Sequence, residues 1–432
     1  MSITKCFIQQ CDAFNQSSTQ NGRAIERWVV ALSGGLDSMV LLDLAHKLLP
    51  QEHVVALHVN HQQQECAEQW QQFCQQQCAL RNIEYFPFQV SPVGKSEQAL
   101  RDSRYACFSS FLNTNDCLLL AHHAIDQAET VLFRLVRGAG SKGLSAMPVS
   151  RNLSSGQLLR PLLSVSKTLL QSYAAQGLQW VEDPSNRSLI YDRNFIRHKV
   201  VQPLLEHWPK ACEQMALSAQ LLANEYQVLE SYLAADVKKI ANSSQLDIQK
   251  WSAYPESKGL LLLKHWLGEN TDAQVSRKQL QCVLESVIQS KLDSKGHCQI
   301  GNYVVRRYKK QLYLINTTEY FQSWPKLNSF KCSYTLSQGV LGFEPSCQGI
   351  EWLEGMYLSN KQDGMSIKVA KRPLKKLKKI FQEQQIAPWL REQWPILMYK
   401  NEIVAIPGIC INSEWMKECK NKSYFYPQWQ PL

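Results

Sequence analysis

The chain has 432 residues, 44% of them hydrophobic, and a formal net charge of +10 at pH 7. A chain of this length is too long for one compact core, so we expect two or three domains. It contains no run of about 18 apolar residues and no cationic N-terminal stretch followed by an apolar core, which argues against a membrane span and a secretory signal. The positive charge is compatible with a polyanionic partner and equally with a solvated basic surface.

The 14 cysteines are scattered singly, and no two of them form a CxxC pair. Cys74 and Cys78 share one helix face, but without a second pair they are typical of packing residues rather than metal ligands. This distribution argues against a zinc ribbon, an iron–sulfur cluster and a redox pair. Together with the missing secretory signal, it predicts a protein of the reducing cytoplasm.

Strand-like and helical patterns alternate over roughly the first half of the chain. Apolar runs typical of strands lie at residues 28–32, 54–59, 83–88 and 117–121. Helical patterns separate them, near residues 39–49, 65–81 and 97–112. Repeated βα units of this spacing predict an α/β fold with a doubly wound parallel sheet, whose ligands bind at the carboxyl ends of the strands.

The first strand runs directly into the string SGGLDS, residues 33–38, and then into a helical pattern. Such a turn directs backbone N–H groups and the positive end of a helix at one spot, which favours phosphate. Glycine lets the backbone approach the ligand, serine adds hydroxyl donors, and Asp37 is placed to hold magnesium between phosphate oxygens. An ordinary βα turn is the alternative. The residues expected in this loop are Ser33, Gly34, Gly35, Leu36, Asp37 and Ser38.

The segment HHAIDQAETVLFRLVRGAG, residues 122–140, begins where the fourth strand ends. His122, Asp126 and Glu129 are spaced i, i+4 and i+7, so one face of a helix start would present an imidazole and two carboxylates. Such a group could hold magnesium or a cationic amine, or the two acids could simply complement the helix dipole. The residues that follow strands two and four are also expected to face the crevice: His58, Asn60, His61, His122 and His123.

An arginine-rich stretch covers residues 182–200, EDPSNRSLIYDRNFIRHKV. Arg193, Asn194 and Arg197 stand where a new helix is expected to begin. Guanidinium groups suit phosphate oxygens and the charge that develops at a transferring phosphoryl group. Plain salt bridges are the alternative, because they are the usual fate of surface arginines.

The rest of the chain predicts a long connector helix over residues 211–239, a small helix-plus-hairpin module, and a basic C-terminal region. Three domains are therefore expected: an α/β catalytic domain at 1–208, a small α+β domain at 209–318 and an α+β domain at 319–432. The string KVAKRPLKKLKK, residues 368–379, holds seven Lys or Arg residues. Pro373 is expected to open a helix with Lys375, Lys376, Lys378 and Lys379 on its exposed side, either solvated or gripping an RNA backbone.

The string SGGLDS resembles the PP-loop of ATP pyrophosphatases, which cleave ATP between the α and β phosphates. Gly94, Lys95 and Ser96 do not form a Walker loop, because Gln89 stands where the leading glycine belongs. With its later motifs the chain resembles the tRNA(Ile)-lysidine synthetase family. Those motifs are HVNH at 58–61, HHAIDQAET at 122–130, EDPSN at 182–186, DRNFIR at 192–197 and KKLKKIFQEQQIAPWLREQWPI at 375–396. One departure is the run Gln62, Gln63, Gln64, where relatives often carry a glycine and an arginine.

The resemblance implies a two-step reaction on the cytidine at the first position of a CAU anticodon. ATP adenylates O2 of the base and releases pyrophosphate, and the ε-amine of free L-lysine then attacks C2 and releases AMP. The product, lysidine, changes codon reading from AUG to AUA and the identity of the tRNA from methionine to isoleucine. The implied partners are isoleucine tRNA and L-lysine, and a homodimer is compatible with the sequence.

The resemblance also implies roles for particular residues. ATP is assigned to the SGGLDS residues and to His58, and Mg²⁺ to Asp37 and Asp126. Catalysis is assigned to Asp37, His122, Asp126, Glu129 and Arg197. Contacts with tRNA are assigned to Arg104, Arg193, Asn194, Lys375, Lys376, Lys378 and Lys379. Which carboxylate binds metal and which binds lysine stays open at this point.

Three other functions are compatible with parts of the pattern. An amide-forming synthetase with a glutaminase half would need a nucleophilic cysteine, often the residue after Met1, where this chain has Ser2. A tRNA sulfur transferase would need paired or persulfide-bearing cysteines beside the loop. A non-enzymatic RNA-binding protein on a degenerate loop would not need the intact Asp37, Asp126, Glu129 and Arg197.

Overall fold

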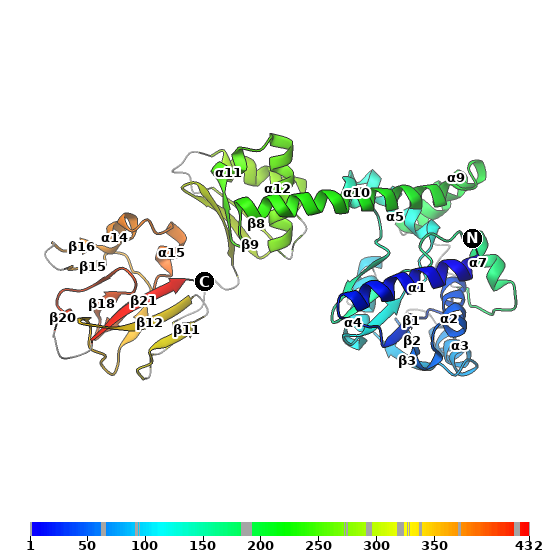
Figure 1. Cartoon of the computed structure of the whole chain (residues 1–432), viewed down its shortest axis with the longest axis horizontal. Helices are drawn as coiled ribbons and strands as arrows, with labels where there is room; N and C mark the ends of the chain where they lie inside the picture. The colour runs from blue at the N-terminus through cyan, green and yellow to red at the C-terminus, as the bar shows by residue number, and fades with distance from the viewer. Residues whose placement is uncertain are drawn as a thin grey trace. The chain divides into compact units, whose positions relative to one another are not determined.

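The computed structural model describes residues 2–61, 66–90, 94, 96–182, 192–271, 273, 275–290, 296–317, 324–325, 327, 329–336, 339–369, 373–418 and 424–431. The chain forms two compact units, Met1–Leu229 and Glu230–Leu432 (Figure 1). Two features singled out from the sequence lie outside the described residues. They are the run Gln62, Gln63, Gln64 and the EDPSN motif beyond Glu182.

A six-stranded sheet with the order β3-β2-β1-β4-β6-β5 forms the centre of the first unit. Five strands are parallel, and β5 pairs antiparallel with β6. The strands are β1 (Arg27–Ala31), β2 (Val54–Asn60), β3 (Glu84–Gln89), β4 (Asp116–Leu119), β5 (Ser150–Leu153) and β6 (Gly156–Leu159). The predicted α/β class and parallel sheet are confirmed. The β5–β6 hairpin was not predicted, because each of its strands is only four residues long.

Helices cover both faces of this sheet, as a doubly wound fold requires. On one face, Trp28 and Val30 of β1 pack in a core with residues of α1, α2, α3 and α7. On the other face, Val29 packs in a core with Phe108 and Leu112, at the end of α4. These helices are α1 (Ile3–Gln20), α2 (Leu36–Leu48), α3 (Ala67–Ala79), α4 (Glu97–Phe111) and α7 (Lys167–Ala174). Helix α1 was not predicted from the sequence, although Ile3, Phe7 and Cys11 give it one buried face.

Apart from the short η1 (Gln51–His53) before β2, the remaining helices of the first unit follow β4, and two of them, α8 and η3, carry the described part of the arginine-rich segment. They are α5 (Ala124–Val136), α6 (Ser141–Leu144), α8 (Asp192–Phe195), η3 (Ile196–Val201), α9 (Gln202–His207) and the start of α10 (Ala211–Ile240). A separate core joins Ala124 and Ala128 of α5 to Ile196 and Val201 of η3. The packing of η3 on α5 therefore places the arginines of α8 and η3 beside the first turns of α5.

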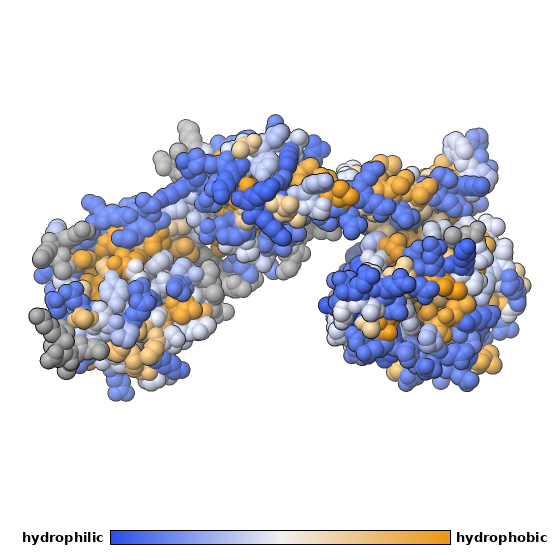
Figure 2. Space-filling model, viewed as in Figure 1, coloured by the Kyte–Doolittle hydropathy of each residue, from blue (hydrophilic) through white to orange (hydrophobic). Residues whose placement is uncertain are grey.

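Figure 2 shows apolar side chains at the surface along α10, where Leu217, Leu221 and Val228 are exposed.

The second unit begins with helices and an antiparallel sheet of the order β7-β10-β9-β8. Its strands are β7 (Gln245–Asp247), β8 (His297–Ile300), β9 (Tyr303–Tyr308) and β10 (Gln311–Asn316). Its helices are α11 (Ile248–Ser252), α12 (Glu256–Asn270), α13 (Arg277–Cys282) and η4 (Val283–Ile288). The hairpin predicted near residues 303–315 is therefore present as β9 and β10.

The C-terminal part of this unit is built from short antiparallel strands around a core that includes Phe381 and Trp394. Its sheets are β11-β12-β21, β14-β17-β18-β19, β13-β20 and β15-β16. The strands are β11 (Ser333–Leu336), β12 (Gly339–Ser346), β13 (Gln348–Gly349), β14 (Tyr357–Ser359), β15 (Ser366–Ile367), β16 (Lys375–Lys376), β17 (Ile396–Tyr399), β18 (Glu402–Ile406), β19 (Cys410–Ile411), β20 (Lys417–Glu418) and β21 (Tyr424–Pro431). Two helices, α14 (Leu377–Glu383) and α15 (Pro388–Glu392), complete it.

The predicted start of the basic helix at Pro373 was wrong. Lys375 and Lys376 form β16 and pair with β15, and the helix begins only at Leu377. The buried side chains of Leu377, Ile380 and Phe381 fix the inward face of α14. Lys376, Lys378 and Lys379 remain exposed, as predicted, whereas Lys375 is half-buried and pairs with Glu383. Within the described residues, no helix is both long and apolar enough to span a bilayer.

Candidate active site

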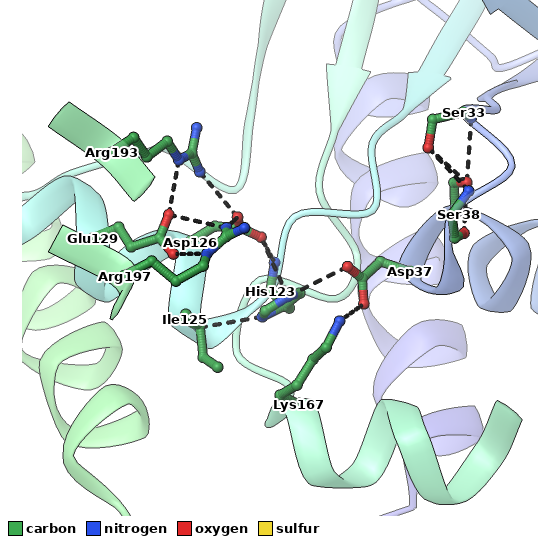
Figure 3. Close-up of polar contacts among 11 residues, drawn as sticks. Ser33, Asp37, Ser38, His123, Ile125, Asp126, Glu129, Lys167, Arg193 and Arg197 are labelled. Atoms are coloured by element: carbon green, nitrogen blue, oxygen red, sulfur yellow. Dashed lines mark hydrogen bonds and ion pairs between the residues drawn. The ribbon is translucent and has the colours of Figure 1, made fainter. Parts of the chain in front are cut away.

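The SGGLDS loop connects β1 to α2 at the carboxyl edge of the sheet. Gly34 has φ of +84°, and a Cβ there would lie 3.0 Å from both Cys74 Sγ and Val181 Cγ2, so the position requires glycine. Gly35 is the N-cap of α2 and offers no side chain to the first N–H groups of the helix. The hydroxyl oxygens of Ser33 and Ser38 lie 3.0 Å apart, and Ser38 donates to the Gly35 carbonyl (Figure 3). The loop thus presents helix N–H groups and two hydroxyls together, which is a favourable environment for phosphate.

Asp37, in the first turn of α2, points out of the loop toward the side chains of Lys167 and His123 (Figure 3). Its Oδ1 lies 2.6 Å from Nζ of Lys167, the first residue of α7. Its Oδ2 lies 3.6 Å from Nε2 of His123. Burial by itself would raise the pKa of Asp37, but His123 and Lys167 lower this pKa below its ordinary value. Asp37 is therefore an anion at neutral pH.

His123 links the loop to the next helix. It is the N-cap of α5: its Nδ1 accepts from the backbone N–H of Ile125, and Asp126 accepts from the backbone N–H of His123 at 2.9 Å. Because Nδ1 is used as an acceptor, Nε2 is the ring nitrogen that donates. That Nε2 lies 3.6 Å from a carboxylate oxygen of Asp37 and 3.6 Å from one of Asp126. A single imidazole therefore stands between the two acidic side chains.

His122 lies outside the helix, so the prediction that it shares a helix face with Asp126 and Glu129 was wrong. The chain is already extended at His123, and α5 begins at Ala124. The Nδ1 atom of His122 instead accepts from Arg160 Nε at 3.2 Å. Burial lowers the pKa of His122 to about 3, although Asp126 opposes the shift. His122 is therefore a neutral imidazole beside a guanidinium.

Asp126 and Glu129 do converge, and two arginines hold them (Figure 3). Arg193 donates through Nε to Glu129 at 2.8 Å and through Nη2 to Asp126 at 2.9 Å. Arg197 donates to both oxygens of Glu129 and approaches Asp126 at 3.4 Å. The Glu129 side chain is only 1% exposed. Burial would raise the pKa of Asp126, but His123, His122 and Arg193 lower it far below its ordinary range.

The other predicted site residues occupy less central places. His58, at the end of β2, bonds through Nδ1 to the carbonyl of Leu32 at 2.8 Å, and burial lowers its pKa. It thereby braces the strand that leads into the loop. The positive charge of Arg104, on α4, contributes to the lowered pKa of His61 and of His122. Asn194 lies in α8 between Arg193 and Phe195. The four C-terminal lysines belong to the second unit.

Among the described residues, no group of three or more His, Cys, Asp or Glu side chains could hold a metal by itself. Magnesium usually takes one or two protein carboxylates and completes its coordination with water and substrate phosphates. Asp37 suits that role because its carboxylate is 32% exposed and adjoins the phosphate loop. Asp126 is less accessible, since its oxygens already accept from His123 and Arg193.

Two side chains of the site were not assigned from the sequence: His123, expected only to face the crevice, and Lys167. Lys167 is 130 residues from Asp37, so no local pattern connects them. One signal was available, because Ser166 followed by a helical pattern predicts a helix start at Lys167. A lysine in a first helical turn opposes the helix dipole, which indicates that it has another partner.

The parallel sheet, the phosphate loop and the acidic site beside it are the features of a PP-loop ATP pyrophosphatase. Models of protein families match three parts of the chain: a PP-loop domain at residues 6–204, a TilS substrate binding domain at 246–313 and a TilS substrate C-terminal domain at 357–426. The tRNA(Ile)-lysidine synthase of Vibrio vulnificus (strain CMCP6) is 35% identical over 425 residues, covering 94% of this chain and 97% of that protein. That of Serratia proteamaculans is 34% identical, covering 92% and 95%. The chain belongs to the tRNA(Ile)-lysidine synthase family.

Proposed function

We propose that the protein is an ATP-dependent carbon–nitrogen ligase that converts the first anticodon cytidine of a CAU isoleucine tRNA into lysidine. The observation that carries this proposal is the link through His123 between the phosphate loop at Asp37 and the buried acidic pair at Asp126 and Glu129. Such a link suits a reaction that needs ATP and a cationic amine at adjoining sites. The family models and relatives, which span most of the chain, support the same activity.

The first step is adenylation of the base. The cytidine O2 attacks the α phosphorus of ATP, and the bond from that phosphorus to the bridging oxygen breaks, so that pyrophosphate leaves. The helix N–H groups at Gly35 and Leu36 and the hydroxyls of Ser33 and Ser38 bind the phosphates. Magnesium, held by Asp37, would neutralise charge on the leaving pyrophosphate. His58 supports this region by bonding the carbonyl of Leu32.

The second step is attack by lysine. Its ε-amine, after losing a proton, forms a bond to C2, and the bond from C2 to O2 breaks so that AMP departs with that oxygen. Asp126 and Glu129 are the anions that bind the cationic groups of lysine, in place of the guanidinium groups of Arg193 and Arg197. Arg197 is then available to the adenylated centre, and His122 lines the same site as a neutral imidazole.

The proposal extends to the division of labour along the chain. Residues 1–208 form the catalytic domain, and residues 209–318 and 319–432 form two tRNA-binding domains. The positions of the three family matches support these boundaries. Arg104, Arg193, Asn194 and the C-terminal lysines contact tRNA, and the exposure of Lys376, Lys378 and Lys379 supports this role. The enzyme is proposed to act in the cytoplasm, as a monomer or a homodimer.

Incorporation of radiolabelled lysine tests the function directly. An unmodified isoleucine tRNA transcript with a CAU anticodon is incubated with the protein, ATP and magnesium, with a CAU methionine tRNA as the control. We expect label in the isoleucine transcript alone. AMP on the tRNA without lysine would refute lysine as the nucleophile and point to sulfur or ammonia, and absence of both label and pyrophosphate would refute the function.

A further inference from the structure

The ammonium group of Lys167 lies in the active site but has no role in the two proposed steps of the reaction. It lies 2.6 Å from Asp37 Oδ1 (Figure 3), and the side chains of Lys167 and Asp37 are 30% and 32% exposed. Helix α7 is anchored beside α2, because Leu170 and Ala174 are buried in the same core as Met39 and Leu42. The backbone that carries Lys167 is thus fixed next to the phosphate loop, while its ammonium group stays accessible.

The position of Lys167 is electrostatically unfavourable without an anion nearby. It is the first residue of α7, where the helix dipole favours negative charge. Asp37 supplies the compensating anion in the structure. Lys47 shows the opposite arrangement: it lies in the last turn of α2, where it complements the dipole and pairs with Asp43 of the same helix.

Resting on the proposed function, we propose that Lys167 is a catalytic residue that binds the phosphates of ATP. With magnesium held by Asp37, the ammonium group of Lys167 would need another anion within reach of its stem. The phosphates of ATP at the adjoining SGGLDS loop would be that anion. An ammonium there offsets negative charge on the pyrophosphate as it leaves. Arg193 and Arg197 do not supply this charge in the structure, because they hold Asp126 and Glu129.

The test compares Lys167→Met and Lys167→Arg with the control Lys47→Met. This control removes another lysine–aspartate pair of the same unit, the one between Lys47 and Asp43. Equilibrium dialysis measures binding of the magnesium complex of α,β-methylene-ATP, and of adenosine as the phosphate-free probe. We expect Lys167→Met to weaken binding of the analogue roughly 10-fold and leave adenosine binding unchanged. Pyrophosphate release on the tRNA should fall by about 10²-fold, as for the loss of one preorganised charge at a transition state.

Lys167→Arg should bind the analogue within about threefold of the wild type, because it keeps the charge. Lys47→Met should match the wild type in every assay. Unchanged analogue binding and pyrophosphate release in Lys167→Met would overturn the proposal, and so would an equal loss of adenosine and analogue binding. If Lys167→Met does not fold, Lys167→Gln replaces it with the same expected results. A failure of the proposed function would be distinguishable from a failure of the Lys167 proposal, because the wild-type protein would then transfer no lysine to the tRNA in the same preparation.

Discussion

The two acidic sites of the catalytic unit differ in exposure and in how their charge is balanced. Asp37 is about one-third exposed and is paired with one ammonium group and a more distant imidazole. Glu129 is almost fully buried and, with Asp126, is gripped by two guanidinium groups. An ammonium on a flexible stem can leave an exposed carboxylate at little cost, whereas forked guanidiniums must break several hydrogen bonds at once.

This difference suits the ligands proposed for the two sites. On this proposal, magnesium and ATP would meet a carboxylate that solvent already reaches. The proposed lysine substrate would have to displace Arg193 and Arg197 from a buried pair, so its binding would be coupled to a rearrangement that frees both arginines. We therefore expect changes at the exposed site to act mainly on the first step of the reaction, and changes at the buried site to act on lysine transfer and on stability.

The largest effect is expected from Asp37→Ala. This change removes the proposed magnesium ligand and leaves Lys167 without its partner. Pyrophosphate release on the isoleucine tRNA should fall by at least about 10³-fold. The exposed Asp12, changed to Ala, is the control and should have no effect. Full activity of Asp37→Ala would refute the assignment of the loop.

A smaller and different effect is expected from Glu129→Gln. The substitution keeps the shape but leaves Arg193 and Arg197 with one carboxylate between them. We expect the KM for lysine to rise by at least about 10-fold while pyrophosphate release stays within about threefold, and the free energy of unfolding to fall by about 2 kcal/mol. Urea denaturation and steady-state kinetics measure these changes. A loss of pyrophosphate release as large as that of Asp37→Ala would show that the two sites are not separable.

The basic surface of the second unit provides a reference outside both sites. Changing Lys376, Lys378 and Lys379 to Gln should weaken tRNA binding about 10-fold at moderate salt and reduce the salt dependence of binding, because each phosphate contact releases counterions. Adding Lys375→Gln should have a smaller effect, since that side chain already pairs with Glu383. Filter binding over a range of salt concentrations tests this. Unchanged affinity and unchanged salt dependence would remove these lysines from the tRNA contact.

The smallest effect is expected from the half-buried imidazole of His122, beside the second site. The pKa of His122 is about 3 in the folded protein and about 6.5 in an unfolded chain, so unfolding takes up a proton between these values. His122 therefore contributes stability above pH 6.5 that is lost as pH falls toward 3, by up to about 1.4 kcal/mol per pH unit. His122→Gln should flatten the fall in the free energy of unfolding between pH 6.5 and 5. An exposed control, His53→Gln, should not change it.

Much of the catalytic unit could be predicted from local patterns. The SGGLDS string marked the phosphate loop because the turn, the glycine and the hydroxyl groups needed there are adjacent in the chain. The alternation of apolar runs and helical patterns predicted the parallel sheet for the same reason. The predictions failed where the decisive contact is not local. Helix α1 is stabilised by its packing on the sheet, and β5 exists only through its pairing with β6.

The sequence alone therefore determined the fold class, the loop and the set of acids and arginines, since these depend on residues close together in the chain. The tertiary structure alone decided which of them meet. His122 and His123 are adjacent in the chain, yet the cap of α5 turns His123 toward both acidic sites. His122 instead accepts a hydrogen bond from Arg160. The partner of Asp37 was decided by the packing of α7 on α2, which brings Lys167 across 130 residues. Side-chain direction and long-range packing are set by the whole core, and no short segment encodes them.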